Sequence, residues 1–383
     1  MNVIYLIPHS PSTAGFDSVE EFIEYAAYHR KVCDMLLNRG VEVEIAMLTQ
    51  KSHTKKIING ITVEAYEVTT GSSFGWEVSV GLIRRLCGET GVDVVHFHGY
   101  NQPNAIPYLT ATVSQHHIIV QNHGSALDRG NLKHEIWYRL IIPYLRHCSA
   151  VLSVDKEELD NLSSFISDQT KLHHLPNAID PTEFKPSSTR AARHRLGLDS
   201  DTQYGLFVGR LTEKKGIEYL LDAVANLGSE IDLRLLLVYS GSSDKQKQII
   251  EDKISDLDIE DQINMVGAVD HSQMSVYYNA ADFCVFPSTS EGFGVVVLEA
   301  MACGTPVIAS KEHLGGGHVT DGENCLITDP HSPNDISDSI TRLLHSPDLQ
   351  KRLTERGRKT VLEQYTYDLV IDNLIDRYKE ATK

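Results

Sequence analysis

Two acidic side chains, Glu291 and Glu299, interrupt a segment that is otherwise apolar and rich in glycine. Glu291 belongs to a loop, because it follows a strand-like run that ends at Pro287. Gly292 and Gly294 then let the backbone turn tightly and approach a ligand closely. A helix that begins after such glycines presents unpaired N–H groups and a partial positive charge, so the ligand expected there is a phosphate.

The helix expected after these glycines runs from Val295 to Ala302 and is apolar on nearly every face, which is typical of a helix buried against a sheet. Gly304 caps its C-terminal end, and Pro306 opens the next strand. Glu299 lies about one turn inside, where its carboxylate can reach a neighbouring hydroxyl. The alternative is that Glu299 is a capping or salt-bridged residue and that Glu291 lies on an ordinary loop surface. This segment alone does not decide between them.

A second pair of candidate residues, Arg210 and Lys215, lies on one predicted strand-to-helix loop. A strand is expected from Tyr204 to Val208, and a helical pattern of apolar residues begins at Ile217. In an open parallel sheet such loops lie at the carboxyl edge, where ligands bind, and the loop with the first acidic residue opens on the same edge. An arginine fork and a lysine point charge suit a diphosphate. For this pair alone a solvated charge cluster is the alternative, because two further charged residues lie between them.

Strand candidates alternate with helical patterns twice along the chain. The first series is 3–7, 41–48, 92–96, 118–120 and 150–154, and the second is 204–208, 233–238, 263–266, 283–287 and 306–309. Each series predicts a doubly wound parallel sheet, so the expected fold is α/β with two Rossmann-like domains facing a cleft. The stretch 176–192 between them is rich in proline and polar residues, as a linker is.

Length and composition indicate an ordinary globular protein. A chain of 383 residues is too long for one typical core and suits two α/β domains. The formal charge of −17 argues against nucleic acid as a partner, because a phosphate backbone would be repelled unless basic residues were clustered. The sequence contains no such basic run.

Cysteine usage and apolar runs bear on the cellular location. The six cysteines are scattered without a close pair, which is typical of reduced thiols in a cytosolic protein. The chain begins with the strand-like run Val3 to Ile7 instead of a secretory signal, and no apolar run approaches the ~18 residues that span a bilayer. We therefore expect a cytoplasmic protein. A helix over Trp137 to Arg146 has apolar and basic faces, so peripheral membrane contact is an alternative there to core packing, which is favoured.

Taken together, these segments resemble the family-4 retaining glycosyltransferases, which have the two-domain architecture called GT-B. The matching segments, in the family's order, are LLNRGVEVEI (36–45), DVVHFHG (93–99), LPNAID (175–180), VGRLTEKKGIEYLLDA (208–223) and SEGFGVVVLEAMACGTPVIAS (290–310). They extend across nearly the whole chain, and the segment with the paired glutamates is the most specific. The resemblance implies an acceptor-side domain over 1–180, a nucleotide-sugar-binding domain over 181–364, and a helix over 365–383 that crosses back to the first domain.

The resemblance also implies roles for the candidate residues. Arg210 and Lys215 would hold the donor diphosphate, Glu291 would contact the hydroxyls of the donor sugar, and Glu299 would contact the nucleoside ribose. The remaining expected binding residues are Gly15, Gly292, Phe293, Gly294 and Val295. The donor would be a UDP-, GDP- or other nucleotide diphosphate sugar. No cofactor or metal is expected, which agrees with a basic pair neutralising the diphosphate.

His123 is the candidate catalytic residue of the first domain. It follows the strand expected over 118–120 and precedes Gly124, a placement similar to the family's strand-end histidine near the sugar. Its imidazole can donate to a sugar hydroxyl or to charge that develops near the anomeric centre. This role depends largely on the resemblance, because a lone histidine is more often structural.

Two further patterns invite a metal site. His96 and His98 alternate along a strand and so point the same way, but the sequence offers no convincing third ligand. Asp199 and Asp201 look like the metal-binding aspartate pair of another glycosyltransferase fold, yet they lie in a polar loop before the first strand of the second domain. We therefore predict no metal ligands.

Two loops depart from the family's pattern. The loop over 8–17 offers only Gly15, where the family usually has adjacent glycines near the diphosphate and the acceptor. The segment 315–318 reads Gly-Gly-Gly-His, where the family more often carries two glycines followed shortly by a glutamate. Flexible N–H groups there can still cradle a phosphate or a sugar. These departures leave the choice of acceptor and of sugar open.

The sequence therefore predicts a retaining glycosyltransferase that moves a hexose from a nucleotide diphosphate sugar to the hydroxyl of a sugar, lipid-linked or small-molecule acceptor. Arg210, Lys215 and the helix N-terminus after Gly294 would stabilise the departing diphosphate. Retention by double displacement would need a carboxylate opposite the leaving group. The resemblance instead places Glu291 against sugar hydroxyls and implies attack from the leaving-group face. A phosphorylase or nucleotide-sugar hydrolase on the same fold, and a noncatalytic nucleotide-sugar binding protein, remain as alternatives.

Overall fold

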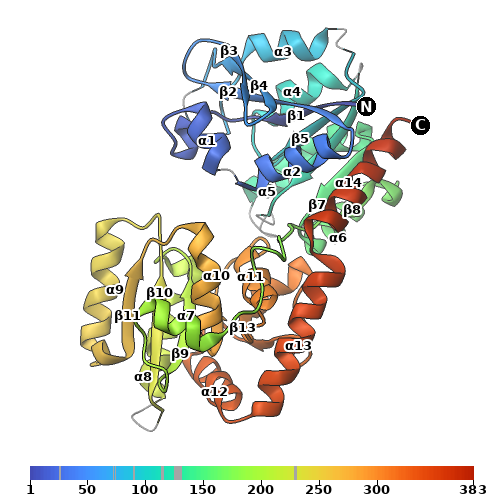
Figure 1. The fold of residues 1–383 in the computed structure, drawn as a ribbon. Coiled ribbons are helices and arrows are strands. Elements are labelled where there is room, and N and C mark those ends of the chain that lie inside the picture. Colours follow the sequence, from blue (N-terminus) through green and yellow to red (C-terminus); the bar gives the residue numbers. More distant parts are fainter. Residues whose placement is uncertain are drawn as a thin grey trace. The chain divides into compact units, whose positions relative to one another are not determined.

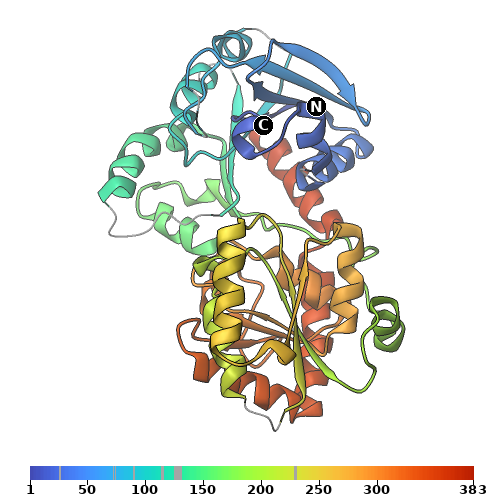
Figure 2. The same ribbon diagram turned by 90° about the vertical axis from the view of Figure 1, so that its left-hand side faces the viewer.

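The computed structural model of the protein describes residues 1–25, 27–71, 73, 75–88, 91–113, 116–124, 132–227 and 231–383. The chain divides into two compact units, each built on one sheet flanked by helices (Figures 1 and 2). Unit 1 comprises Met1–Pro176 and Asp368–Lys383, and unit 2 comprises Asn177–Tyr367.

In the described part of unit 1, eight strands form a sheet in the order β3-β4-β2-β1-β5-β6-β7-β8. Their bounds are β1 (Asn2–Ile7), β2 (Glu42–Thr49), β3 (Thr54–Ile58), β4 (Ile61–Glu67), β5 (Val94–His98), β6 (His117–Asn122), β7 (Ala150–Ser153) and β8 (Leu172–His174). Neighbours pair in parallel except β3 and β4, which form an antiparallel hairpin at one edge. Because parallel strands are covered on both faces, β1 and β7 are almost continuously apolar and buried.

Helices of unit 1 cover this sheet, and the last helix of the chain is one of them (Figure 1). They are α1 (Val19–Tyr25), α2 (Ala27–Asn38), α3 (Val80–Cys87), α4 (Ala105–Thr112), α5 (Leu132–His147), α6 (Lys156–Ser163) and α14 (Tyr367–Ala381), with short 3-10 turns η1 (Ser12–Ala14) and η2 (Gln169–Lys171). Arg39 pairs with Asp368 and Asp372 on α14. The hydroxyl of Tyr378 lies 2.7 Å from Nδ1 of the buried His96. Because exposed ion pairs contribute little, the buried face of α14 is its main anchor.

Unit 2 is built on a sheet whose described strands are all parallel, in the order β11-β10-β9-β12-β13-β14. They are β9 (Gln203–Val208), β10 (Leu233–Val238), β11 (Ile263–Gly267), β12 (Phe283–Phe286), β13 (Val307–Ser310) and β14 (Leu326–Thr328). The helices are α7 (Thr189–Leu196), α8 (Ile217–Asn226), α9 (Asp244–Asp256), α10 (His271–Ala280), α11 (Val295–Cys303), α12 (Pro333–Leu344) and α13 (Pro347–Gln364), with 3-10 turns η3 (Glu213–Lys215), η4 (Glu260–Gln262) and η5 (Lys311–Gly316). The chain order β9, β10, β11 on one side and β12, β13, β14 on the other makes the sheet doubly wound.

The predicted fold class, two doubly wound parallel sheets, is confirmed. Every strand predicted from an apolar run is present, with ends that shift by up to two residues. The sequence analysis missed β3, β4, β8 and β14. The linker expected over 176–192 already contains the start of α7.

The helix expected over Trp137 to Arg146 is part of α5. Its inner face packs in the core of unit 1 through Ile141 and Leu145, which are fully buried. Ile136 and Leu140 lie on its outer face and are each about half exposed. Core packing therefore accounts for one face of α5, and peripheral membrane contact through the other stays a prediction.

Candidate active site

The helix α11 begins at Gly294, which has a left-handed φ of +79°. A Cβ at this position would lie 2.5 Å from Cδ2 of His313, so only glycine fits without a shift of the fully buried histidine. No side chain of the described residues caps the start of α11. Its first N–H groups are therefore placed to meet an anion, as the glycine pattern predicts.

Glu291 lies beside this helix start and is held by an ion pair with Lys215. The Nζ atom of Lys215 donates to Oε2 of Glu291 over 2.6 Å, and the hydroxyl of Ser288 donates to the same oxygen over 3.2 Å. His313 Nε2 lies 3.9 Å from this oxygen. Burial opposes ionisation of Glu291, but the charge of Lys215 and these hydrogen bonds hold its pKa below the usual value. A carboxylate and an ammonium group thus face each other beside the helix N-terminus.

Glu299 lies inside α11 and is buried, as the apolar pattern around it predicts. Tyr278 donates its hydroxyl to Oε2 of Glu299 over 2.6 Å, and Nε2 of His271 lies 3.2 Å from Oε1. His271 also lies 3.3 Å from a carboxylate oxygen of Glu183, and its pKa is raised by its hydrogen bond to Glu299. An ionised carboxylate has about four lone-pair positions, so Glu299 retains capacity for a ligand hydroxyl.

Arg210 follows β9 at the carboxyl edge of the sheet, as predicted. Among the residues that the structure describes, its guanidinium has no hydrogen bond or ion-pair partner, and the residue is exposed. The next residue, Leu211, donates its N–H to the hydroxyl of Ser242, which fixes the backbone of the loop. Arg210 therefore remains available to an anionic ligand.

The glycine run before His318 packs tightly around that histidine. A Cβ at Gly316 would lie 2.5 Å from Nδ1 of His318, and the ring of Phe293 lies 4.6 Å from the His318 ring. Tyr365 donates its hydroxyl to the carbonyl of Gly317 over 3.0 Å. His318 thus occupies, as a fully buried aromatic ring, the segment in which the family more often has a glutamate.

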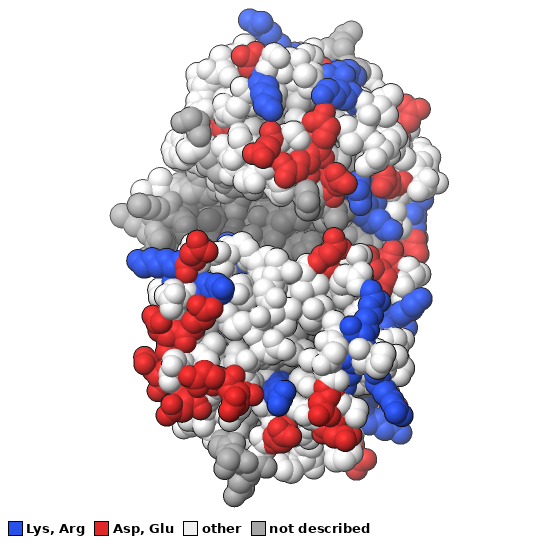
Figure 3. Space-filling model, turned by 60° about the vertical axis from the view of Figure 1, so that its left-hand side comes forward, with Lys and Arg blue, Asp and Glu red and all other residues white. Residues whose placement is uncertain are grey.

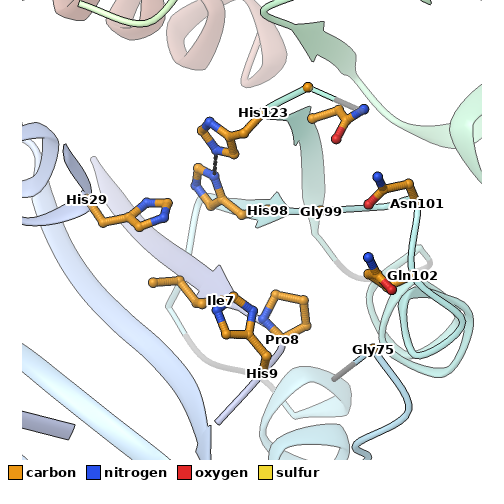
Figure 4. Close-up of a pocket in the computed structure, with 12 residues that line it drawn as sticks. Ile7, Pro8, His9, His29, Gly75, His98, Gly99, Asn101, Gln102 and His123 are labelled. Carbon is orange, nitrogen blue, oxygen red and sulfur yellow. Dashed lines mark hydrogen bonds between the residues drawn. The ribbon is translucent and has the colours of Figure 1, made fainter. Parts of the chain in front are cut away.

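A second candidate site lies within unit 1, where a pocket of about 360 Å³ opens at the ends of β1, β5 and β6 (Figure 4). The described residues that line it are Ile7, Pro8, His9, His29, Gly75, His98, Gly99, Asn101, Gln102, Asn122, His123 and Gly124. The sequence predicted His123 at this strand end. Gly15 was predicted as a binding residue in the loop after β1. It ends η1 with a φ of +90° and is not among the residues that line the pocket.

The loop after β1 is fixed by a buried carboxylate that the sequence analysis missed. Glu77 is fully buried and accepts the backbone N–H of Ser10 over 2.9 Å and its hydroxyl over 2.5 Å. Thr13 and Gln50 donate to the same carboxylate over 2.8 and 2.6 Å. These contacts replace the adjacent glycines of the family with a hydrogen-bonded loop.

His96 and His98 lie side by side on β5, as predicted, with ring centroids 4.1 Å apart. His96 contacts Tyr378, whereas Nδ1 of His98 lies 2.7 Å from Nε2 of His123. His29 on α2 lies beside both His98 and His123. Among the described residues, the histidines whose ring nitrogens lie close enough to share a metal ion are His29, His98 and His123, a group that the sequence, which considered His96 with His98, did not predict. Asp199 accepts the backbone N–H of Asp201 over 2.9 Å, which fits the interpretation of this pair as an ordinary turn.

From the sequence we also predicted that basic residues are not clustered, that no apolar run spans a membrane and that the cysteines are reduced. On the face drawn in Figure 3, described acidic side chains gather at the lower left, and basic side chains lie along the right-hand side with acidic ones among them. Within the described residues, no helix is long and apolar enough to cross a membrane. All six cysteines are free, and five are buried while Cys87 is exposed.

Comparison with known families assigns both halves of the chain. Residues 26–183 match the family described as Glycosyltransferase Family 4, and residues 188–360 match Glycosyl transferases group 1. The chain belongs to the group 1, family-4 glycosyltransferases. It is a glycosyltransferase that transfers a sugar from a nucleotide sugar.

Relatives with similar sequences carry the same assignment. An uncharacterized glycosyltransferase of Methanocaldococcus jannaschii is 26% identical over 377 residues, which cover 93% of this chain and 94% of the relative. A D-inositol 3-phosphate glycosyltransferase of Segniliparus rotundus is 34% identical over 225 residues, which cover 57% of this chain and 49% of the relative. The match to this second glycosyltransferase thus spans about half of its length.

Solved structures of other proteins have a similar fold. Sucrose-phosphate synthase from Thermosynechococcus elongatus superposes with a TM-score of 0.78 at 21% identity, covering 99% of this chain and 98% of that one. Anabaena Alr3699/HepE in complex with UDP-glucose superposes with a TM-score of 0.74 at 15% identity, covering 99% of both chains. This glycosyltransferase therefore has the predicted GT-B fold.

Three contacts of this glycosyltransferase were not predicted. His29 lies on α2, Glu77 lies in a loop after the turn at Gly75, and His271 begins α10 after the end of β11. Each of these side chains contacts a residue that is far away in the sequence, so no local sequence pattern indicates the contact. The signal that would have pointed to Glu77 is an acidic residue in an otherwise apolar stretch, which is the signal that singled out Glu299.

Proposed function

We propose that this glycosyltransferase transfers a hexose, with retention at the anomeric carbon, from a nucleotide diphosphate sugar held by unit 2. In this proposal Lys215 and Arg210 bind the diphosphate, and Glu291 binds hydroxyls of the sugar. Glu299 binds the ribose, and His123 donates to the sugar or to charge that develops at the anomeric centre.

The observation that carries the proposal is the pairing of Lys215 and Glu291 beside the N-terminus of α11. An ammonium group and a row of helix N–H groups both favour a diphosphate. A carboxylate at the same place would repel that diphosphate, so its useful partners are the uncharged hydroxyls of a sugar. The diphosphate and the sugar would thus be bound by different groups in the same cluster of loops.

Catalysis would come mainly from stabilising the leaving group. Charge builds on the diphosphate oxygen as the bond to the sugar breaks, and fixed positive groups that face it lower the barrier. Lys215 supplies a point charge, Arg210 supplies a fork of donors, and α11 supplies oriented N–H groups. Removal of one such donor typically slows an enzyme by about 10²–10³-fold.

Retention would follow from attack on the leaving-group face. A double displacement needs a carboxylate free to attack the opposite face. Glu291 is engaged by Lys215 and Ser288, which suits an orienting role and does not suit a nucleophile. The acceptor hydroxyl would then be the nucleophile, and its proton would pass to a departing phosphate oxygen.

UDP-glucose is the donor to test first, because the similar Anabaena protein is described in complex with it. The acceptor hydroxyl would belong to a sugar, a lipid-linked or a small molecule, and inositol 3-phosphate is one candidate because several relatives are named for it. The unit 1 pocket is the proposed acceptor side, since its polar lining can bind hydroxyls.

A panel of nucleotide sugars tests the proposal in two stages. Thermal stabilisation of the full chain first identifies the donor, because a ligand that binds only the folded state raises Tm. Turnover of that donor is then measured with an acceptor panel, with phosphate and with water. Transfer to a hydroxyl acceptor with retained configuration is expected. Turnover only with phosphate or water would reveal a phosphorylase or hydrolase, and binding without any turnover would refute catalysis.

A further inference from the structure

Three histidines converge in the unit 1 pocket, and the proposed transfer uses only one of them. His29 comes from α2, His98 from β5, and His123 from the segment after β6 (Figure 4). Each offers a ring nitrogen, and these three nitrogens all lie within 4.8 Å of one another. Imidazole nitrogens in such a cluster are the ligands preferred by zinc and related divalent ions.

His98 has an unsatisfied nitrogen in this cluster. This residue is 4% exposed, and within the described part of the chain its Nε2 has no hydrogen-bond partner, although Nδ1 contacts His123. A buried polar atom without a partner costs about 1–3 kcal/mol, so such atoms call for an explanation. When the proton of His98 is on Nε2, its Nδ1 carries a lone pair that faces Nε2 of His123 over 2.7 Å, and these are the two nitrogens that a metal ion would bind.

His29 has the second contact that metal-binding histidines usually make. Its Nδ1 lies 2.8 Å from the hydroxyl of Tyr5, and Tyr5 is fully buried. A hydrogen bond at one ring nitrogen fixes the orientation of an imidazole and leaves the other nitrogen as the ligand. The ring of Tyr5 also lies 3.9 Å from the ring of His98, which restrains that residue as well.

Protons compete weakly for these nitrogens. Burial, together with the neighbouring histidines, lowers the pKa of His29 and of His98 well below the usual value. Burial thus favours the neutral imidazole, which is the form that binds metal. Among the described residues the cluster contains no carboxylate, which disfavours Mg²⁺ and Ca²⁺ because both prefer oxygen ligands.

We propose that His29, His98 and His123 form a binding site for a divalent transition-metal ion of the zinc class, with a fourth position open to the pocket. Zinc lies about 2.0–2.1 Å from each nitrogen, so tetrahedral ligands are about 3.3 Å apart. The 2.7 Å between His98 and His123 would widen by roughly 0.6 Å as the ion replaces their hydrogen bond. Small side-chain rotations achieve this.

Occupancy of the site would oppose transfer, a consequence that rests on the proposed function. The ion would hold the imidazole of His123 that the proposed mechanism directs at the donor sugar. Bound metal would also occupy part of the proposed acceptor pocket. The site is therefore inhibitory in this proposal and is unrelated to neutralisation of the diphosphate.

Metal binding is measured on the full, tag-free chain without any donor, so its outcome is independent of activity. Chelator-treated protein is titrated with Zn²⁺ by calorimetry and with Co²⁺ by visible absorption, which reports tetrahedral nitrogen ligands. We expect one tight equivalent. His29→Gln and His98→Gln should each weaken it at least tenfold, whereas His9→Asn, in the same pocket but outside the cluster, should leave it unchanged.

The chain has 18 histidines, so weak binding elsewhere is separated by its stoichiometry and by these variants. Circular dichroism and thermal unfolding check that each variant folds, and His29→Gln carries the test if His98→Gln does not fold. Absence of binding in the parent chain, or equal affinity in a folded His29→Gln variant, would overturn the proposal. A bound ion that leaves transfer unaffected would retain the site and refute its inhibitory role.

Discussion

Replacing Lys215 by methionine separates the two tasks that we assign to its ammonium group. The side chain keeps most of its length and loses its charge, so packing of the aliphatic part persists. Lys215 is expected both to stabilise the buried carboxylate of Glu291 and to bind the donor diphosphate. The first task belongs to the free protein, and the second appears only with ligand.

The size of each effect follows from the geometry. The Lys215 and Glu291 side chains are 22% and 14% exposed, so the pair is neither fully buried nor solvated. Breaking a fully buried pair costs about 3–5 kcal/mol. Partial exposure and the remaining hydrogen bond from Ser288 reduce the expected loss of unfolding free energy to about 1–3 kcal/mol. Loss of a charge-assisted contact to diphosphate, about 1.5–3 kcal/mol, should weaken nucleotide binding roughly 10- to 150-fold.

A double variant distinguishes these effects. The double variant Lys215→Met with Glu291→Gln has no charged group at either position. Most of the free energy of unfolding that Lys215→Met loses should therefore be recovered, whereas the affinity for nucleotide should stay low. Urea unfolding gives the stability, and calorimetric titration with the nucleoside diphosphate that stabilises the protein gives the affinity. If nucleotide affinity in folded Lys215→Met equals that of the parent, the assignment of Lys215 to the diphosphate is refuted.

The stability of the single variant Lys215→Met should also depend on pH in a characteristic way. In the parent chain the pKa of Glu291 is below its unfolded value of 4.5, so its contribution to stability is present above that pH and is lost as pH falls through the folded pKa. Without Lys215, burial should raise this pKa above the unfolded value. The cost of burying the unpaired Glu291 carboxylate would then be largest at neutral pH, and protonation at lower pH would relieve it. The stability difference between the two chains should shrink between pH 7 and pH 4, and a constant difference would contradict the ion-pair account.

Three further predictions concern the donor. Arg210→Ala should weaken nucleoside diphosphate binding by about 1.5–3 kcal/mol with little change in stability, because the side chain is exposed; unchanged affinity in calorimetry would remove it from the site. Glu299→Gln should weaken free nucleotide and nucleotide sugar alike, whereas Glu291→Gln should spare free nucleotide and slow turnover, so identical behaviour of the two variants in titrations and initial rates would contradict the separate roles. Transfer should persist in excess chelator, measured as initial rate, and a loss that Mg²⁺ alone restores would show that the cationic groups do not suffice.

The sequence predicted what local patterns determine. Buried parallel strands are nearly continuous apolar runs, and glycine before α11 marks a backbone that no larger residue fits, so both were found. The hairpin of β3 and β4 was missed because β3 is largely exposed and carries no apolar run. The partners of Glu299 and of His98 were missed for a different reason. Tyr278, His271 and His29 approach from helices whose packing depends on the whole unit.

The buried carboxylate of Glu77 holds the loop after β1, so exchanging this loop alone with that of a relative should not preserve its conformation. Where adjacent glycines shape such a loop, the conformation is encoded in the loop itself. Here it also depends on a distant residue, because Ser10 and Thr13 are oriented by Glu77, which lies 67 and 64 residues away in the sequence. A chimera that receives a relative's glycine-containing loop would leave Glu77 buried without these donors, at a cost of several kcal/mol. If unit 1 binds the acceptor, as we propose, acceptor preference is a property to be exchanged by whole unit rather than by segment.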